Sequence, residues 1–520
     1  MTPSERSPRS VGATALAVVA VYGLLMAALA WAVMSIGSLN LQLMVALPLT
    51  VGICALPLLL HQAQFRFWRP LDLLLLASMV CVFTAPFLGS FTSKISIIRL
   101  GLGLLFAGCL VLGLVPRNTD SGFTGKLVIV FAIYQIVPIL EAKNPQLAVV
   151  RGANWLGFIP LAFIAYDRLA IQRLMKSLVL TTGLLLSGLV LQLQGKLGGT
   201  WGGILIEGST YNPVTSRWLQ RYTSFLYNPN DFGLAMALIA LVAFGTFVCV
   251  KGKRRPSLLI IGVLATGGLA LSSSRGGYLA FGLGISYLVY KVRSRQTVAG
   301  IIAICFCFTA LVAAVPTVRT FTVETVASIG DLWHGTDKSA ADRQELWSKN
   351  FAIRSVSGLG YGGNAEVSNV DISDSVARAK AYSAQTIDSS WLKLLVEEGL
   401  IGVGLFALIV MSAARRVLQR GRSGPSASPV AAILGMVGVA FFFRSLSVDM
   451  LDINPWNWVL WLLIGLALSQ VVSEDLPLEN PPDERIGSRP LATMTTLVGQ
   501  SESVGRADWR DVRPWAESRQ

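Results

Sequence analysis

The sequence predicts an all-α membrane protein that crosses the bilayer about fourteen times and carries one large extracytoplasmic loop domain. Three observations lead to this fold class. Hydrophobic residues make up 53% of the 520-residue chain and charged residues only 14%, against roughly 25% charged residues in soluble domains. Apolar runs of about twenty residues, long enough to span a bilayer as helices, recur along most of the sequence. Most Lys and Arg residues fall in short segments between alternate runs, as expected for cytoplasmic loops.

The apolar runs form three groups, which divide the chain into domains. The N-terminal transmembrane helices are expected in residues 1–193, a second group in 231–316 and the C-terminal group in 389–472. The first run is too long for the apolar core of a signal peptide, so we keep it as a transmembrane helix. In order, the expected spans are 11–36, 41–60, 71–88, 96–115, 126–141, 148–166, 177–193, 231–250, 257–273, 276–291, 297–316, 389–413, 428–447 and 454–472.

The basic residues orient these helices. Short loops on one side are rich in Arg and Lys, whereas those on the other side hold chiefly Lys94 and Lys143. With an even number of spans, both termini lie on the basic, cytoplasmic side. Two longer polar segments, residues 194–230 and 317–388, then face outward, and the tail at 473–520 is expected to be cytoplasmic and mostly disordered. The basic loop residues are Arg66, Arg69, Arg117, Lys126, Arg168, Arg173, Lys176, Lys251, Lys253, Arg254, Arg255, Lys291, Arg293, Arg295, Arg415, Arg416, Arg420 and Arg422.

The composition argues against two other classes of protein. A net charge of +14 would suggest nucleic-acid binding in a soluble protein, but membrane orientation accounts for the positive charge here. All six cysteines fall in apolar runs and the two histidines are His61 and His334, so a structural zinc site is not expected. We therefore expect no nucleic-acid partner, no metal and no cofactor.

Two arginines stand on the face where the orientation rule predicts little positive charge. Arg221 precedes an Asn-Pro-Asn-Asp stretch in which Asn230 or Asp231 can cap the following helix. Arg275 lies in the turn between two spans, next to glycines whose backbone N–H groups could approach the same anion. A guanidinium presents a fixed fork of donors that suits phosphate oxygens. Each arginine can also be an ordinary interfacial residue that contacts lipid headgroups.

The outer segment 317–388 holds a third arginine and a glycine-rich stretch. Arg343 lies on a predicted amphipathic helix at the membrane face, where it is either a functional cation or a solvated surface charge. The run Gly358–Gly363 superficially resembles a nucleotide-binding glycine motif. No strand–turn–helix context surrounds this run, so we predict a tight, flexible turn.

Three carboxylates mark the helix that follows this segment. Asp388 lies at its mouth, where it can act as an N-cap or as a proton acceptor. Glu397 and Glu398 should lie about 13 Å further in, at about 1.5 Å per residue. A charge near mid-membrane costs at least about 2.5 kcal/mol, so both should face a polar cavity or a partner. Arg99 and Arg444 are candidate partners, and a structural ion pair is favoured over direct catalysis.

These residues, in this order, resemble the O-antigen ligase and O-antigen polymerase superfamily over roughly residues 215–445. The motifs that carry the resemblance are Arg221 with Asn228-Pro229-Asn230, then Ser274-Arg275-Gly276-Gly277, then Arg343 with Trp347 and Gly358-Leu359-Gly360-Tyr361-Gly362, then Asp388-Ser389 with Leu392, Leu395 and Glu397-Glu398-Gly399-Leu400-Ile401-Gly402. The resemblance implies a metal-independent, GT-C-like membrane glycosyltransferase that uses sugar chains carried on undecaprenyl diphosphate.

The resemblance also implies roles for individual residues. Arg221 and Arg275 would neutralise the diphosphate and Asp388 would accept a proton, which makes these three the candidate catalytic residues. In ligases a histidine lies two residues before the serine of this motif, and here that position is Ile387, so the chain resembles a Wzy-type polymerase more than a ligase. The residues expected to bind the diphosphate or the glycan are Arg217, Arg343, Asn228, Asn230, Tyr361 and Glu397.

The function that this resemblance implies is polymerisation of undecaprenyl-diphosphate-linked oligosaccharide repeat units into a surface polysaccharide or exopolysaccharide. The reaction would take place on the outer face of the bacterial cytoplasmic membrane. The alternatives are a ligase that transfers lipid-linked glycan to another acceptor, and a transporter or flippase of lipid-linked oligosaccharide or of a small solute. The lipid bilayer and the lipid-linked substrate are expected partners, and a flippase and a chain-length-regulating co-polymerase are candidate protein partners.

Overall fold

The computed structural model describes much of the chain between Pro70 and Ser469. The described residues are 70–84, 103, 105–113, 115–118, 121–142, 148, 151–152, 155–194, 200–201, 204–205, 209–212, 217–226, 228–249, 255–292, 295–333, 344, 347–348, 355–361, 389–420, 428–448, 450–451 and 455–469. They all belong to one unit, Met1–Leu478. The tail expected at 473–520 lies outside the described residues.

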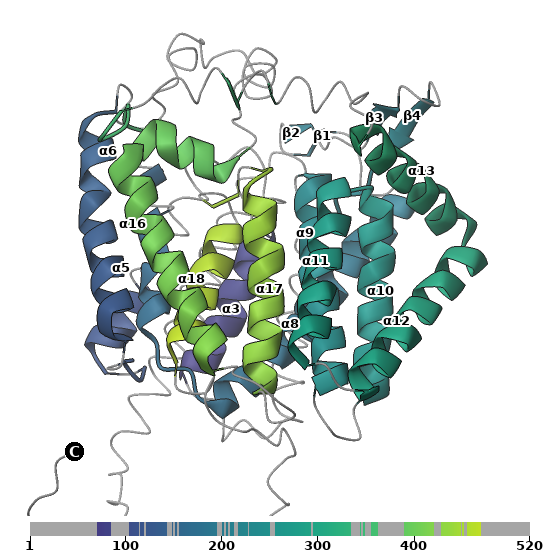
Figure 1. The fold of residues 1–520 in the computed structure, drawn as a ribbon, viewed down its shortest axis with the longest axis horizontal. Coiled ribbons are helices and arrows are strands. Elements are labelled where there is room, and N and C mark those ends of the chain that lie inside the picture. Colours follow the sequence, from purple (N-terminus) through teal and green to yellow (C-terminus); the bar gives the residue numbers. More distant parts are fainter. Residues whose placement is uncertain are drawn as a thin grey trace, which may run out of the picture. The chain divides into compact units, whose positions relative to one another are not determined.

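Helices make up most of the regular structure in these residues (Figure 1). The α-helices are α3 (Pro70–Thr84), α5 (Gly122–Tyr134), α6 (Ile136–Leu140), α8 (Arg168–Leu193), α9 (Pro229–Cys249), α10 (Arg255–Ser272), α11 (Arg275–Val292), α12 (Arg295–Ala314), α13 (Pro316–Trp333), α16 (Ser390–Arg420), α17 (Pro429–Ser445) and α18 (Trp456–Leu468), and the 3₁₀ helix η4 covers Ile159–Phe163. The prediction of a mainly helical protein is therefore confirmed.

Two short antiparallel hairpins lie within the expected outer loop 194–230. In the first, β1 (Thr200–Trp201) pairs with β2 (Ile204–Leu205). In the second, β3 (Ser209–Asn212) pairs with β4 (Arg217–Gln220), so that Arg217 lies opposite Asn212. These strands were not predicted, because the segment has no sustained alternation of polar and apolar residues.

Four of the described helical stretches are long and apolar enough to cross a membrane: Gly122–Leu140, Ala170–Leu193, Pro229–Cys249 and Ser390–Gln419. A fifth is obtained if α12 and α13, which meet at an angle of 112°, are counted as one broken span. Helices α10, α17 and α18 are apolar but shorter. The runs expected at 11–36 and 41–60 lie outside the described residues, so a total of about fourteen spans stays a prediction.

The expected span at 148–166 differs from a single α-helix where the structure describes it. The chain is α-helical at 155–157, passes into η4, and is extended at Ile164, which forms a β-bridge with Arg117. Pro160 lies in the first turn of η4. Proline has no backbone N–H and its ring clashes with the preceding turn, so the α-helix cannot continue through this position.

Helix α9 lies at the centre of its group of helices and packs against α10, α11 and α17. Small residues let the neighbouring helices approach closely, as is usual for helix packing in membranes. Gly245 lies against α17, where an added Cβ would be 2.7 Å from the side chain of Met436 and 3.0 Å from that of Ile433. A larger residue at Gly245 would therefore require the side chains of Met436 and Ile433 to move.

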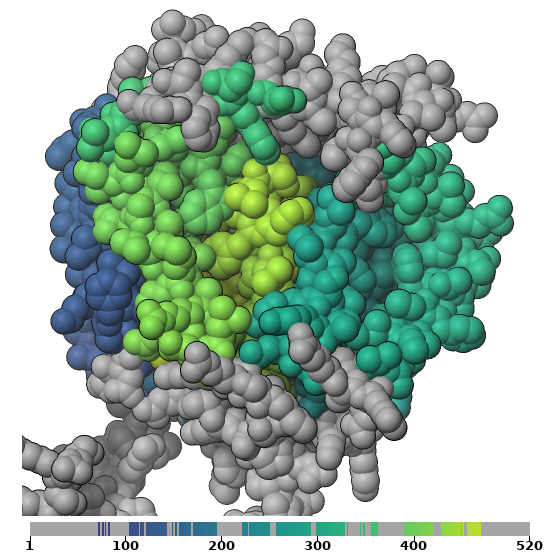
Figure 2. Space-filling view, viewed as in Figure 1, coloured from purple at the N-terminus to yellow at the C-terminus, as the bar shows by residue number. Residues whose placement is uncertain are grey.

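Helices α16, α17 and α18 form a second group of packed helices. Figure 2 shows α17 at the surface between α16 on one side and α11 on the other. Helix α18 packs behind them against η4 and α16, and the side chains of Trp456, Trp458 and Trp461 are fully buried. Because indole rings are large and stiff, these three tryptophans hold α18 in a fixed position.

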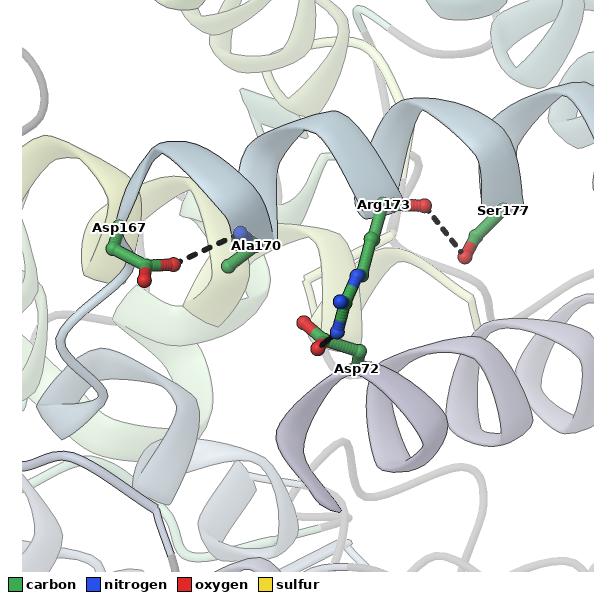
Figure 3. A network of polar contacts seen from close by, with 5 residues as sticks. All are labelled: Asp72, Asp167, Ala170, Arg173 and Ser177. Atoms are coloured by element: carbon green, nitrogen blue, oxygen red, sulfur yellow. Dashed lines mark hydrogen bonds and ion pairs between the residues drawn. The ribbon is translucent and has the colours of Figure 1, made fainter. Parts of the chain in front are cut away.

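A buried ion pair joins α3 to α8 (Figure 3). The guanidinium of Arg173 pairs with the carboxylate of Asp72, and both side chains are buried. Asp167 caps α8 by accepting a hydrogen bond from the N–H of Ala170 at 2.9 Å, and Ser177 donates to the Arg173 carbonyl at 3.0 Å. An unpaired buried charge would cost several kcal/mol, so this pairing fixes how the two helices meet.

Candidate functional site

Arg221 is held against the turn between α10 and α11. Its Nε donates a hydrogen bond to the carbonyl of Ser272 at 3.0 Å, and its Nη2 donates to Oδ1 of Asn230 at 2.9 Å. The backbone N–H of the next residue donates to the carbonyl of Leu271 at 3.3 Å. The structure thus brings Arg221 to the turn that carries Arg275, although the two arginines belong to different segments of the chain.

The α10–α11 turn is tight, and the side chain of Ser274 is held by hydrogen bonds. Ser273 has a positive φ of 48°, which lets the chain reverse before α11 begins at Arg275. The hydroxyl of Ser274 accepts a hydrogen bond from the N–H of Gly277 at 3.2 Å, and so caps α11. The same hydroxyl donates to Oδ1 of Asn230 at 3.3 Å. Asn230 therefore connects Arg221 with the cap of α11.

Asn228 is the residue that caps α9, which corrects the prediction that Asn230 or Asp231 would do so. Its Oδ1 accepts a hydrogen bond from the N–H of Asn230 at 2.8 Å. Its carbonyl accepts from the N–H groups of Asp231 and Phe232, each at 3.0 Å. Pro229 occupies the first helical position, where its fixed φ suits the helix and its missing N–H costs nothing. The side chain of Asn230 is consequently left to bind Arg221.

A further arginine, Arg444, joins this site from the end of α17. Its guanidinium lies against Gly276, where an added Cβ would overlap it, and its Nη1 donates to Oγ of Ser447 at 2.9 Å. Arg444 also lies near enough to Asp231 for their charges to attract, while Asp231 accepts a hydrogen bond from Nε1 of Trp456 at 2.9 Å. From the sequence, Arg444 was expected only as a partner for a glutamate.

We call Arg221, Arg275 and Arg444 the arginine cluster. Arg444 is buried, whereas Arg221 and Arg275 are partly exposed. Beside them, Tyr222 packs edge-on against Phe321 of α13, with ring centroids 5.8 Å apart. Burial raises the pKa of the Tyr222 phenol, so this residue stays neutral and adds no negative charge next to the guanidinium groups.

Helix α16 is broken at Gly399, which has φ 70° and ψ −169°. Figure 1 shows a first segment that crosses the upper end of the bundle and a second segment that descends beside α5. Glu397 and Glu398 are the last residues before the break. The helix bends directly after them, so both carboxylates lie at the corner of a bent helix, where two segments meet, and their depth in the bilayer stays a prediction.

The turn 355–361 fills this break, which confirms the turn expected at the glycine-rich stretch where it is described. The backbone N–H of Gly360 donates to the carbonyl of Glu397 at 3.1 Å. From the other side of the break, the N–H of Leu400 donates to the carbonyl of Ser355 at 3.2 Å. Two glycines of the turn have positive φ values of 93° and 76°, and their lack of side chains permits this close approach. The turn thus replaces hydrogen bonds that the break removes from α16.

Glu397 forms an ion pair with Arg151, which the sequence analysis did not consider as a partner. Glu397 is 6% exposed, so its charge needs such a partner. The partners suggested from the sequence were Arg99, which lies outside the described residues, and Arg444, which lies against Gly276. The structural ion pair expected for this residue is present.

Glu398 is held by uncharged groups. Its Oε2 accepts a hydrogen bond from Nε2 of Gln135 at 3.1 Å, and its carbonyl accepts from the hydroxyl of Tyr134 at 2.6 Å. The hydroxyl of Tyr361 donates to Oε1 of Gln135 and lies 3.4 Å from Oε1 of Glu398. Tyr361 is fully buried in this network, so the site residue expected to contact glycan is part of the joint between α5, α16 and the turn.

Residues 260–407 match the O-antigen ligase family. The match confirms the resemblance to the O-antigen ligase and polymerase superfamily, which implies glycan transfer of that type. The matched residues contain Arg275, the turn 355–361 and the break in α16, whereas Arg221 and Arg444 lie on either side of the match. No curated protein matches the chain significantly.

The first turn of α16 and the arginine cluster are both connected to the segment 444–451. At the start of α16, Nε1 of Trp391 donates to Oγ of Ser445 at 2.8 Å. The hydroxyl of Ser390 donates to the carbonyl of Val448 at 2.9 Å. Since Arg444 lies in the last turn of α17 and against Gly276 of α11, residues 444–451 connect the first turn of α16 with the arginine cluster.

Three of the expected site residues are not placed by the structure. Asp388 and Arg343 lie outside the described residues, and for Arg217 the structure describes the strand but not the side chain. The residue after Asp388 is Ser389, whose hydroxyl accepts a hydrogen bond from the N–H of Leu392 at 3.4 Å and occupies the N-cap position of α16. Among the described residues, no three His, Cys, Asp or Glu side chains are arranged to hold a metal ion.

Proposed function

We propose that this protein is a membrane glycosyltransferase that polymerises undecaprenyl-diphosphate-linked oligosaccharide repeat units on the outer face of the bacterial cytoplasmic membrane. The observation that supports the proposal is the arginine cluster. Arg221 is fixed by the Ser272 carbonyl and the Asn230 side chain, both of which are uncharged, and it lies beside the turn of Arg275. Guanidinium groups gathered at one place are well suited to the non-bridging oxygens of a diphosphate, which share its negative charge.

In the proposed reaction a hydroxyl oxygen of one lipid-linked repeat unit attacks the anomeric carbon of the growing chain. The new glycosidic bond forms as the bond between that carbon and the diphosphate oxygen breaks, and undecaprenyl diphosphate leaves with the bonding electrons. Arg221 and Arg275 stabilise the negative charge that collects on the leaving group, an electrostatic role that needs no covalent step. Asp388, or another carboxylate of the outer segment, takes the proton from the attacking hydroxyl.

A ligase is the second candidate function, because the family that matches residues 260–407 is described as O-antigen ligase. The absence of histidine at Ile387 supports the polymerase instead. In either case the substrate arrives through the bilayer, and a flippase and a chain-length-regulating co-polymerase are proposed as partners of the polymerase.

Deletion of the gene, followed by sizing of lipid-linked and surface glycan, tests the proposal. Loss of a polymerase leaves single repeat units on the lipid carrier and on the surface. Loss of a ligase leaves long chains on the carrier and none on their acceptor. An unchanged size distribution of both pools would exclude both enzymes.

A further inference from the structure

The residues that follow Arg221 are bound to helix α8 through one buried glutamine. Oε1 of Gln192 accepts hydrogen bonds from the backbone N–H of Thr223 at 3.0 Å and from that of Ser224 at 2.7 Å. Its Nε2 donates to Oγ1 of Thr223 at 2.9 Å. All three residues are buried. We call them the glutamine clamp, because one side chain near the C-terminal end of α8 holds two consecutive residues of the segment that carries Arg221.

Two further contacts hold the same segment on α8. The hydroxyl of Ser224 donates a hydrogen bond to the carbonyl of Leu185. An added Cβ at Gly188 would be 2.4 Å from Oγ of Ser224 and 2.8 Å from the ring of Phe225, so the glycine permits a close approach to the helix. Ser224 has a positive φ of 54°, which is unfavourable for residues other than glycine. Contacts with α8 therefore hold the chain in a conformation that its own sequence does not favour.

Arg221 lies between the glutamine clamp and the α10–α11 turn. Towards the turn, its Nε donates to the carbonyl of Ser272, and the N–H of Tyr222 donates to the carbonyl of Leu271 at 3.3 Å. Towards α8, the N–H groups that Gln192 binds begin two residues after Arg221. The ion pair with α3 holds the opposite end of α8 (Figure 3). Because the backbone is fixed on this side, Gln192 limits where the guanidinium can lie.

We propose that Gln192 is a positioning residue for glycan transfer, an inference that rests on the proposed function. It acts through the backbone of residues 223 and 224, which keeps Arg221 at the arginine cluster. Gln192 lies outside the residues that match the O-antigen ligase family, so the N-terminal helices contribute to the geometry of the cluster. A donor displaced by about 1 Å stabilises a developing charge much less well, so loss of the clamp lowers kcat more than it raises KM.

The Gln192→Met variant tests the inference, because methionine has a similar length and lacks both polar atoms. In full-length protein reconstituted in liposomes, kcat for lipid-linked repeat units should fall about thirtyfold, with KM changed less than about threefold. Gln192→Glu keeps an acceptor for both N–H groups and should restore kcat to within about threefold of wild type. Gln194→Met changes an exposed glutamine at the same end of α8 and should behave as wild type.

A double-mutant cycle separates positioning of Arg221 from a general structural role. If Gln192 acts through Arg221, Gln192→Met should lower kcat less than about twofold in protein that already carries Arg221→Ala. An equal loss of kcat in both backgrounds would overturn the inference, and so would a Gln192→Met kcat equal to that of the Gln194→Met control. If Gln192→Met does not accumulate as folded protein, Thr223→Val takes its place in the cycle, because it removes only the hydrogen bond from Nε2.

Chemical labelling of Arg221 gives a result that does not depend on the reaction. Phenylglyoxal modifies accessible guanidinium groups, and mass spectrometry locates each modified residue. Arg221 should be modified about tenfold faster in Gln192→Met than in Gln194→Met, since its guanidinium leaves the acceptors that hold it. Equal rates would overturn the inference. If wild-type protein transfers no lipid-linked glycan, the proposed function fails, and the labelling still decides whether Gln192 positions Arg221.

Discussion

The arginine cluster and the break in α16 differ in the partners that hold their charged side chains. At the break, Glu397 is paired with Arg151, so its charge is cancelled by a neighbour from another helix. In the arginine cluster, a backbone carbonyl and an amide oxygen accept hydrogen bonds from Arg221 and orient its guanidinium. A guanidinium that is oriented by uncharged acceptors suits an anionic ligand, whereas a carboxylate in an ion pair suits a structural role.

Among the variants that test this difference, those of the arginines themselves should change polymer formation most. Arg221→Ala or Arg275→Ala should lower polymer formation about a hundredfold or more, since loss of one fixed donor to a developing anion costs roughly that much. The measurement is the size distribution of lipid-linked and surface glycan in cells that express each variant at normal level.

Arg319→Ala is the matched control, because Arg319 is an exposed arginine of the neighbouring helix α13. It should complement fully. Full complementation by both Arg221→Ala and Arg275→Ala would mean that the cluster does not bind the leaving group, and the proposed mechanism would be wrong.

The next largest effect is expected at the break. Gly399 has a positive φ, and a Cβ there would overlap the backbone of the turn 355–361. Gly399→Ala should therefore destabilise the protein by about 2 kcal/mol, from backbone strain and from displacement of the turn. A thermal-unfolding series in detergent checks this.

Gly404→Ala on the same helix is its control. Gly404 has ordinary helical geometry and nothing within 4 Å of an added Cβ, so alanine there should leave the melting temperature unchanged or raise it slightly. Equal melting temperatures for the two variants would show that the corner of α16 is not a rigid joint.

A smaller effect is expected at the contact between α11 and Arg444. A Cβ at Gly276 would overlap the Arg444 guanidinium, so Gly276→Ala should displace this arginine and lower transfer activity about tenfold with little loss of protein. Gly282→Ala, on the same helix with open space around it, should retain full activity. If Gly276→Ala retains wild-type activity, Arg444 contributes nothing to the charge of the cluster.

Local sequence patterns were enough to predict a mainly helical chain, whereas the shared site of Arg221 and Arg275 was expected only from the family resemblance. A polar stretch between apolar runs, with arginine on the face that usually lacks it, is a signal that a single sequence contains. The pairing of Glu397 with Arg151 could not be predicted, since nothing in the neighbourhood of either residue specifies the other. The available signal was only that a buried carboxylate needs some partner.

The broken helix was missed for a different reason. A glycine inside an apolar run is tolerated in many straight helices, so Gly399 alone gave little warning. The stronger signal was the combination of two adjacent glutamates before that glycine with a glycine-rich turn earlier in the chain. Asn228 was likewise overlooked as a cap, because the sequence rule was applied to the residues after Pro229 rather than before it.

The repair of α16 by residues 355–361 has a consequence for how this region can be exchanged between relatives. The hydrogen bonds of the corner are shared between the helix and the turn, so neither part is complete alone. A chimaera that receives a foreign outer segment but keeps its own α16 would combine a turn and a helix whose hydrogen-bonding groups do not match. The turn and the helix should therefore be inherited, and transplanted, as one module.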